Sequence, residues 1–267
     1  MNTRTAWERQ CLLREKDRPN INDYIPLIFD EFYELHGDRH YGDDAALMGG
    51  IARIDGMPVT VLAEVKGRDL NENKKTNFAM PHPEGYRKAL RLAKQAEKFH
   101  RPVICCSDTP GAFCGIEAEE RGQGEAIAKN LMDFMTLRTP VTSVVLGEGG
   151  SGGALALGIC DRLAMLENAL YSVISPRGCA SILWKDASKE HEACEILKIT
   201  AEDMVKFGIA EAIIEEPNGS AHYDLYKIAE NIKSFLVETL KENSQKDIDI
   251  LLKERYTKFR KIGEFTE

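Results

Sequence analysis

The chain has 267 residues, a formal net charge of −8, and a content of 43% hydrophobic and 29% charged residues. This composition is typical of a globular enzyme, and the negative charge argues against general nucleic-acid binding. No apolar run approaches the ~20 residues that span a membrane, and residues 1–20 lack the apolar core of a secretory signal, so we expect a cytoplasmic protein. The seven cysteines include no Cys-x-x-Cys pair, which predicts reduced thiols and no metal site.

The first part of the chain predicts a polar lead-in, a helix, a hairpin, a long loop and a second helix. Residues 1–20 are expected to form an N-terminal arm ahead of a single domain over residues 21–267. Asp55-Gly56 joins two apolar runs and is a strong hairpin signal, and Pro83 opens an amphipathic pattern with proline in the first helical turn. The predicted elements are a helix over 23–36, strands over 45–54 and 59–65, a loop over 67–81 and a helix over 83–99.

The rest of the chain alternates strands with helices, which predicts an α/β fold with a largely parallel sheet. A buried strand over 103–107 runs into the turn Asp108–Ala112, and a β-branched run over 141–146 leads into the glycine-rich stretch Gly147–Ala154. Glycines let backbones approach closely, and a helix start presents unpaired N–H groups, so these two units predict a repeated fold with one anion-holding site. The other predicted elements are a helix to about residue 137, strands over 162–166, 169–174 and 210–215, short helices between them, and a helical segment over 223–260.

Two other chemistries fit parts of the glycine stretch. The pattern Gly-x-Gly-x-x-Gly over 147–152 matches a dinucleotide-binding fingerprint, but the helix that follows spans only about two turns before Asp161. Ser151 has the Gly-x-Ser-x-Gly spacing of a hydrolase nucleophile, yet the candidate bases downstream, His191 and His222, lie in charged surroundings. Neither interpretation accounts for the whole stretch.

A backbone site needs no side-chain nucleophile. Asp108 could act as an acid or base, although an aspartate at the start of such a turn more often caps it. Backbone N–H groups at a helix start stabilise an oxygen that becomes negative during a reaction, as in chemistry on thioesters or ureas.

Positive charge is concentrated in one stretch of this acidic chain. Residues 66–101 contain ten Lys or Arg against four Asp or Glu. Lys66, Arg68, Lys74 and Lys75 lie on its long polar loop, and loops of this length in compact domains are usually functional or mobile. We expect a surface that attracts a phosphate-bearing substrate or an acidic partner, with a merely solvated surface as the alternative.

Six motifs occur in one order over roughly residues 20–260. They are GGIARIDGMPV at 49–59, PEGYRKALRLA at 83–93, DTPGA at 108–112, EERGQGEAIAKNL at 119–131, GEGGSGGALALG at 147–158 and SVISPRGCASILWKD at 172–186. Together they resemble the α subunit of bacterial acetyl-CoA carboxylase carboxyltransferase. The resemblance implies a crotonase-like fold, a spiral of repeated β-β-α units, and makes residues 21–267 the carboxyltransferase domain.

The resemblance also implies a reaction and its partners. A carboxyl group passes from carboxybiotin, carried on the biotin carboxyl carrier protein, to acetyl-CoA, which gives malonyl-CoA for fatty-acid synthesis. The resemblance implies an obligate β subunit with its own zinc ribbon, an assembly of two α and two β chains, and cooperation with biotin carboxylase. Carried onto this sequence, Gly152 and Gly153 supply backbone N–H groups of an oxyanion hole, Gly111 and Ala112 line the same pocket, and no metal in this chain and no protein base are required.

The sequence departs from the family pattern at three places. Only about twenty residues precede the match, Phe113-Cys114 stands where Tyr-Pro is usual, and Arg177 stands where glutamate is usual. The alternative function is therefore an altered paralogue that uses another acyl-CoA or has a structural or regulatory role.

Overall fold

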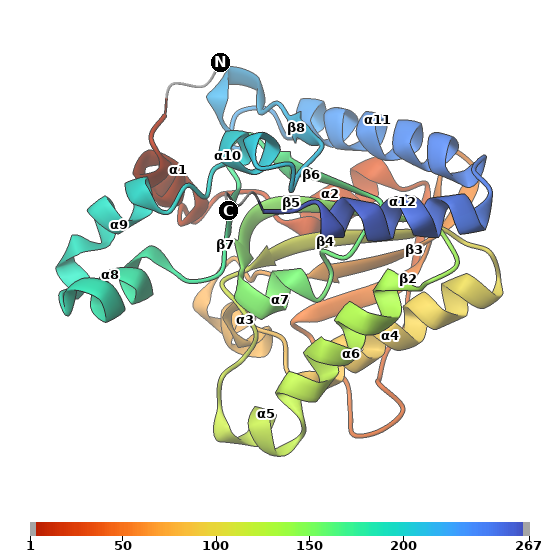
Figure 1. Ribbon diagram of the computed structural model, residues 1–267, viewed down its shortest axis with the longest axis horizontal. Helices are drawn as coiled ribbons and strands as arrows, with labels where there is room; N and C mark the ends of the chain where they lie inside the picture. The colour runs from red at the N-terminus through yellow and green to blue at the C-terminus, as the bar shows by residue number, and fades with distance from the viewer. Residues whose placement is uncertain (1–3, 264–267) are drawn as a thin grey trace, which may run out of the picture.

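The computed structural model describes residues 4–263, and within them eight strands form one mixed sheet (Figure 1). The order is β1-β2-β3-β4-β5-β6-β8, with β7 paired to β5. The first three strands pair antiparallel, and every pairing from β3 onward is parallel. The strands are β1 (Glu31–Glu34), β2 (Leu47–Ile54), β3 (Met57–Glu64), β4 (Val103–Thr109), β5 (Val141–Gly150), β6 (Arg162–Leu166), β7 (Leu170–Ser172) and β8 (Ala212–Ile214).

Helices surround the sheet. Helix α4 packs on β2 and β3 and against α6, whereas α11 packs on α2, β5 and β8 (Figure 1). The helices are α1 (Ala6–Leu13), α2 (Ile21–Ile28), α3 (Leu70–Lys75), α4 (Pro83–Lys98), α5 (Ile116–Glu120), α6 (Gln123–Met135), α7 (Ser151–Leu155), α8 (Pro176–Trp184), α9 (Glu190–Ile196), α10 (Ala201–Lys206), α11 (Leu225–Ser244) and α12 (Ile248–Arg260), with 3-10 turns at Asn77–Ala79, Ala187–Lys189 and Pro217–Gly219. In the described part of the chain, no helix combines the length and apolarity of a membrane span.

Several local predictions are confirmed. Asp55 and Gly56, with φ of 47° and 76°, turn β2 into β3, as the hairpin signal predicted. The helix that opens at Pro83 is α4. Every residue of β4 is buried, because this central strand is covered on both faces.

The predicted helix over 23–36 is wrong in its second half. Helix α2 ends at Ile28, and β1 follows and pairs antiparallel with β2, with Phe32 opposite Ala52. The apolar residues keep their helical spacing beyond Ile28, but this segment is a strand that satisfies its backbone groups against β2. Similarly, the predicted helix to about residue 137 is two helices, because Gly122 adopts φ of 84° between α5 and α6.

Residues 4–20, expected as an arm, contain a helix packed on the body of the protein. Thr5 and Glu8 form a capping box at the start of α1, which fixes where the helix begins. Arg9 is buried, pairs with Glu202, and donates to the carbonyl of Glu167 at 2.7 Å. The long loop predicted over 67–81 likewise holds α3 and a 3-10 turn.

Candidate functional site

The two glycine turns meet at the carboxyl ends of β4 and β5. These strands are parallel neighbours, so the chain leaves both at the same edge of the sheet. A Cβ atom built on Gly153 would lie 2.8 Å from the amide nitrogen of Ala112, and one on Gly150 would lie 2.2 Å from the carbonyl oxygen of Pro110. Such distances are too short for real side chains, so only glycine allows these backbones to touch.

The second turn presents helix-start N–H groups. Strand β5 continues to Gly150 and α7 begins at once at Ser151, whose φ of 52° makes the change of direction sharp. A non-glycine residue in this region is strained, and such strain is concentrated at functional sites. No described side chain caps α7, and the first N–H groups of a helix have no partner within it. Gly152 and Gly153 therefore lie in the first turn of α7, at the edge of the sheet where the two glycine turns meet.

The first turn has a different role at Gly111. Its N–H donates to Oγ1 of Thr109 at 3.0 Å, and its carbonyl accepts from the same hydroxyl at 2.8 Å. Its φ of 146° requires glycine. Gly111 thus shapes the turn, and the half-buried Ala112 follows it against Gly153.

Charged groups lie directly behind the turns. Asp108 Oδ1 accepts from the N–H of Glu148 at 2.9 Å, so Asp108 ties β5 to β4 and bonds the neighbouring strand instead of capping its own turn. Lys66 Nζ lies 3.1 Å from Glu148 Oε2 and 3.9 Å from Asp108 Oδ1. Glu64 is fully buried nearby, and burial, aided by the charge of Asp108, raises the pKa of its carboxyl well above the usual range.

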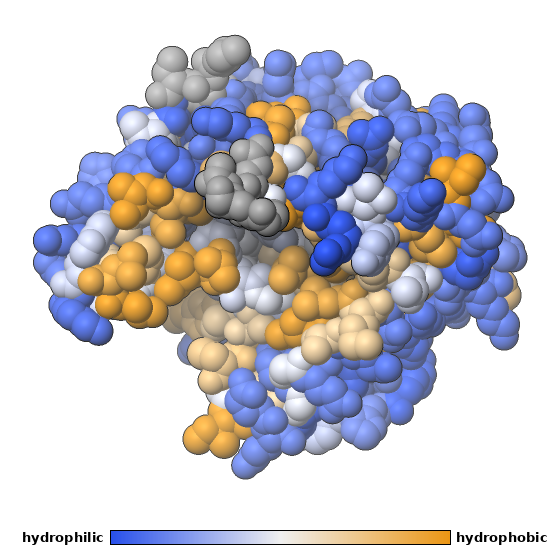
Figure 2. Space-filling model, viewed as in Figure 1, coloured by the Kyte–Doolittle hydropathy of each residue, from blue (hydrophilic) through white to orange (hydrophobic). Residues whose placement is uncertain are grey.

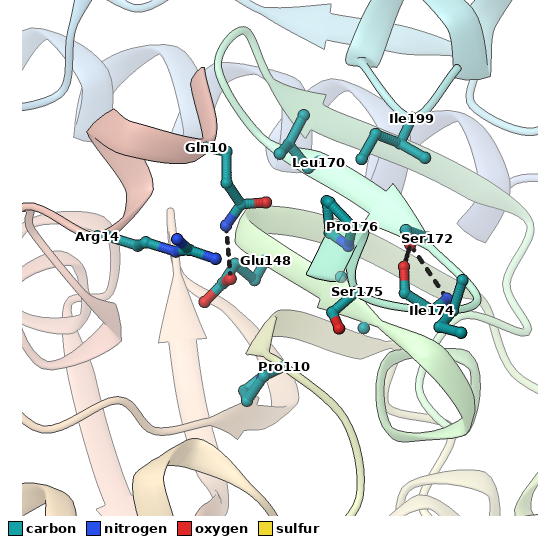
Figure 3. A pocket seen from close by; sticks show the side chains of 12 residues that line it. Gln10, Arg14, Pro110, Glu148, Leu170, Ser172, Ile174, Ser175, Pro176 and Ile199 are labelled. Carbon is teal, nitrogen blue, oxygen red and sulfur yellow. Dashed lines mark hydrogen bonds between the residues drawn. The ribbon is translucent and has the colours of Figure 1, made fainter. Parts of the chain in front are cut away.

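A small cavity of about 50 Å³ adjoins this cluster (Figure 3). Its walls come from the first helix, both glycine turns and the segment that enters α8. The labelled side chains that line it include Gln10, Arg14, Pro110, Glu148, Ser172 and Ser175. Gln10 and Glu148 had not been singled out from the sequence; the one signal for Glu148 is that it is the acidic residue inside a glycine run.

The structure divides the four predicted basic residues. Lys66 and Arg68 line a cleft of about 200 Å³, where Lys66 pairs with Glu148 and Arg68 pairs with Asp23. Lys74 and Lys75 are exposed in the last turn of α3. Two of the four are therefore engaged in ion pairs, and two face solvent.

The candidate bases of a hydrolase have other partners. His222 Nδ1 lies 2.6 Å from Ser220 Oγ, and His191, which is exposed, lies 4.0 Å from Glu195. In residues 4–263, no group of three or more His, Cys, Asp and Glu side chains could hold a metal ion.

Comparison with known proteins identifies the family. A family model described as acetyl co-enzyme A carboxylase carboxyltransferase-like matches residues 1–263. The acetyl-coenzyme A carboxylase carboxyl transferase subunit alpha of Clostridium perfringens is 58% identical over 262 residues, which are 98% of this chain and 97% of that protein. The chain belongs to the alpha-subunit family of acetyl-CoA carboxylase carboxyltransferase. The alpha subunit of Clostridium acetobutylicum is 56% identical, over 98% of this chain and 96% of that protein.

One relative of this alpha subunit is a longer protein. The carboxyl transferase subunits beta/alpha of Clostridium tetani is 53% identical over 99% of this chain, which matches 46% of its length. The name of this relative indicates that it joins the beta and alpha subunits in one chain.

Solved structures show the same fold at low identity. Transcarboxylase 12S, solved with methylmalonyl-coenzyme A and methylmalonic acid, superposes with a TM-score of 0.71 at 18% identity, over 90% of this chain and 45% of that one. A Pseudomonas malonate decarboxylase hetero-tetramer solved with coenzyme A superposes with a TM-score of 0.65 at 20% identity, over 81% and 86%. The predicted crotonase-like carboxyltransferase fold is confirmed.

Proposed function

We propose that this alpha subunit provides the biotin side of the carboxyltransferase site. The N–H groups of Gly152 and Gly153 would bind the carbonyl oxygen of biotin's urea, and Gly111 and Ala112 would wall the pocket. When bound, carboxybiotin on its carrier protein supplies the carboxyl group that acetyl-CoA accepts to give malonyl-CoA. The observation that carries this proposal is the contact between the two glycine turns, which leaves no room for a side chain at Gly153 in the first turn of α7.

The geometry fits a small carbonyl group. Fixed backbone donors favour an oxygen that gains negative charge, and they need no reorganisation as the charge develops. A side chain at Gly153 would collide with the backbone of Ala112 at 2.8 Å, so the cradle exists only with glycine. The protein then contributes binding and orientation here, and no histidine is required beside the turns.

The beta subunit is proposed as the partner that completes the site, in an assembly of two alpha and two beta chains. The family name and the joined Clostridium tetani relative support a beta partner. Figure 2 shows apolar surface near α8 and near α5, on either side of a hollow. The exposed apolar residues of these two helices include Ile182 and Leu183 in α8 and Ile116 at the start of α5. We propose that the beta subunit covers this surface, and that the carrier protein and biotin carboxylase complete the cycle.

The test is reconstitution with the beta subunit. The chain alone should be inactive, and mixing should give a two-plus-two complex by light scattering together with malonyl-CoA decarboxylation that depends on added biotin. Gly153→Val should reduce turnover by about 10²–10³-fold, the usual effect of losing one oxyanion donor, without loss of beta-subunit binding. Gly124→Ala is the matched control, because Gly124 lies in α6 and a Cβ atom built there would meet no atom within 4 Å. Near-normal turnover of Gly153→Val, or full carboxyl transfer by the chain alone, would contradict the proposal.

A further inference from the structure

We propose that Glu148 is a positioning residue that ties the N-terminal helix α1 to strand β5, which leads directly into Gly152 and Gly153 of α7, so that α1 is part of the site. The inference rests on the proposed role of those two glycines. It assigns a function to residues 4–20, which the sequence suggested were only a polar arm.

Glu148 bonds three separate segments of the chain. Its Oε1 accepts from Gln10 Nε2 of α1 at 3.0 Å, and its Oε2 accepts from Lys66 Nζ, after β3, at 3.1 Å. Its backbone N–H donates to Asp108, at the end of β4, at 2.9 Å. Figure 3 shows the Gln10–Glu148 bond, with Pro110 of the first turn below it. Glu148 therefore has both carboxylate oxygens and its backbone N–H in hydrogen bonds.

Lys66 strengthens the link to the N-terminal segment. Its ammonium group also donates to the carbonyl of Leu13, the last residue of α1, at 3.2 Å. Burial by itself would lower the pKa of Lys66, but the neighbouring carboxylates of Asp108 and Glu148 raise it, so the ammonium group stays charged. The predicted role of Lys66 as a free steering charge does not fit these contacts.

Helix α1 is itself anchored, so it can act as a fixed support. Gln10 is 3% exposed, which means that its amide is committed to Glu148 and not to solvent. Arg18 adds a second tie, because it donates to the carbonyl of Leu146 in β5 at 2.9 Å while pairing with the buried Glu216.

The position of these ties explains why they matter for Gly152 and Gly153. The regular pairing of β4 with β5 shifts between Ser107 and Thr109, so the ladder is irregular just where Gly147–Gly149 lie. The side-chain hydrogen bonds to Glu148 hold this part of β5 in place where the regular backbone pairing with β4 is interrupted. A displacement of ~1 Å at a reacting group can reduce a rate by about 10²-fold, so small relaxations of this strand should be visible in turnover.

The test uses the complete complex with the beta subunit and three variants, Glu148→Gln, Lys66→Met and Gln10→Leu. Each should lower kcat by about tenfold or more while KM for acetyl-CoA and for biotin stays within about twofold. The double variant Lys66→Met/Glu148→Gln should lose less than the product of the two single losses, because both variants remove the Lys66–Glu148 bond. Hydrogen exchange in peptides over 147–158 should become faster. Lys129→Met, at a lysine with a 62% exposed side chain on α6, is the matched control.

The outcomes separate this inference from the proposed function. If Gly153→Val abolishes turnover while Glu148→Gln and Lys66→Met keep normal kcat, the positioning role is wrong and the oxyanion site stands. If Gly153→Val is also active, the proposed function itself fails. A rise in KM in place of a fall in kcat would also overturn the inference, because it would assign Lys66 and Glu148 to substrate contact. If Glu148→Gln or Lys66→Met fails to fold, Gln10→Leu still tests the inference, because it removes a bond to Glu148 without removing any charge.

Discussion

The two ends of β5 are both held by ion pairs, but the pairs differ in exposure. At its start, Asp161 accepts from the N–H of Val141 at 2.7 Å and forms a two-bond pair with Arg255, and both side chains are almost fully buried. At its end, Glu148 and Lys66 keep side-chain exposures of 22% and 29%. One strand therefore has a closed anchor at one end and an open, polar cluster at the other.

The difference lies in how completely each charge is satisfied. The guanidinium group of Arg255 also donates to the backbone carbonyls of Phe134, Leu137 and Thr139, so its hydrogen bonds are made inside the protein. The cluster at Glu148 borders a cavity and the glycine turns. A saturated buried network fixes the fold, whereas a half-exposed one can fix a site and still admit a substrate.

The largest effect should follow from breaking the closed anchor. Arg255→Met leaves Asp161 as a buried carboxylate without its partner, and removing one member of a buried pair costs about 3–5 kcal/mol. Urea unfolding should show this loss, with normal turnover per folded molecule. Arg162→Met is the control, because Arg162 pairs with Glu242 at the surface and should change stability by ~1 kcal/mol or less. A similar loss in both variants would contradict the comparison.

A smaller effect is expected at Glu64, beside the open cluster. Its raised pKa means that the folded chain keeps a proton that the unfolded chain releases above about pH 4.3. The free energy of unfolding should therefore contain a part that falls as pH rises above that value, and Glu64→Gln should remove this part. The difference between the two proteins, measured by urea unfolding from pH 5 to pH 8, should grow with pH in favour of the variant. A constant difference would show that Glu64 is ionised in the folded chain.

The smallest effect is expected at the exposed lysines. Lys74 and Lys75 are exposed, so we expect them to act only through long-range attraction, which is screened within ~10 Å at 0.1 M salt. Replacing both by glutamine should raise KM for the carrier or acyl-CoA by about twofold at low salt and leave kcat unchanged. Steady-state kinetics at several salt concentrations would measure this. An unchanged KM and salt response would mean that these two lysines are merely solvated surface.

Much of the fold could be predicted because its signals are local. The Asp55-Gly56 hairpin, helix α4 and the buried strand β4 each follow from a few adjacent residues whose turn chemistry or periodicity is unambiguous. The two glycine turns could be predicted for the same reason, because each follows an apolar strand pattern, and Gly150 and Gly153 occur where the backbones approach closely. The proposed roles of Gly152 and Gly153 come from the family resemblance and stay a prediction. The family likewise follows from long unbroken motifs.

The tertiary structure alone decided what depends on distant partners. Strand β1 exists because β2 satisfies its backbone, although its residues continue the helical spacing of α2. Gln10 gives no signal of function in the sequence, and Lys66 looks like a loop charge until Glu148, eighty-two residues later, is placed beside it. A sequence shows which residues can form a turn or carry a charge, but burial and pairing depend on which segments the completed sheet brings together.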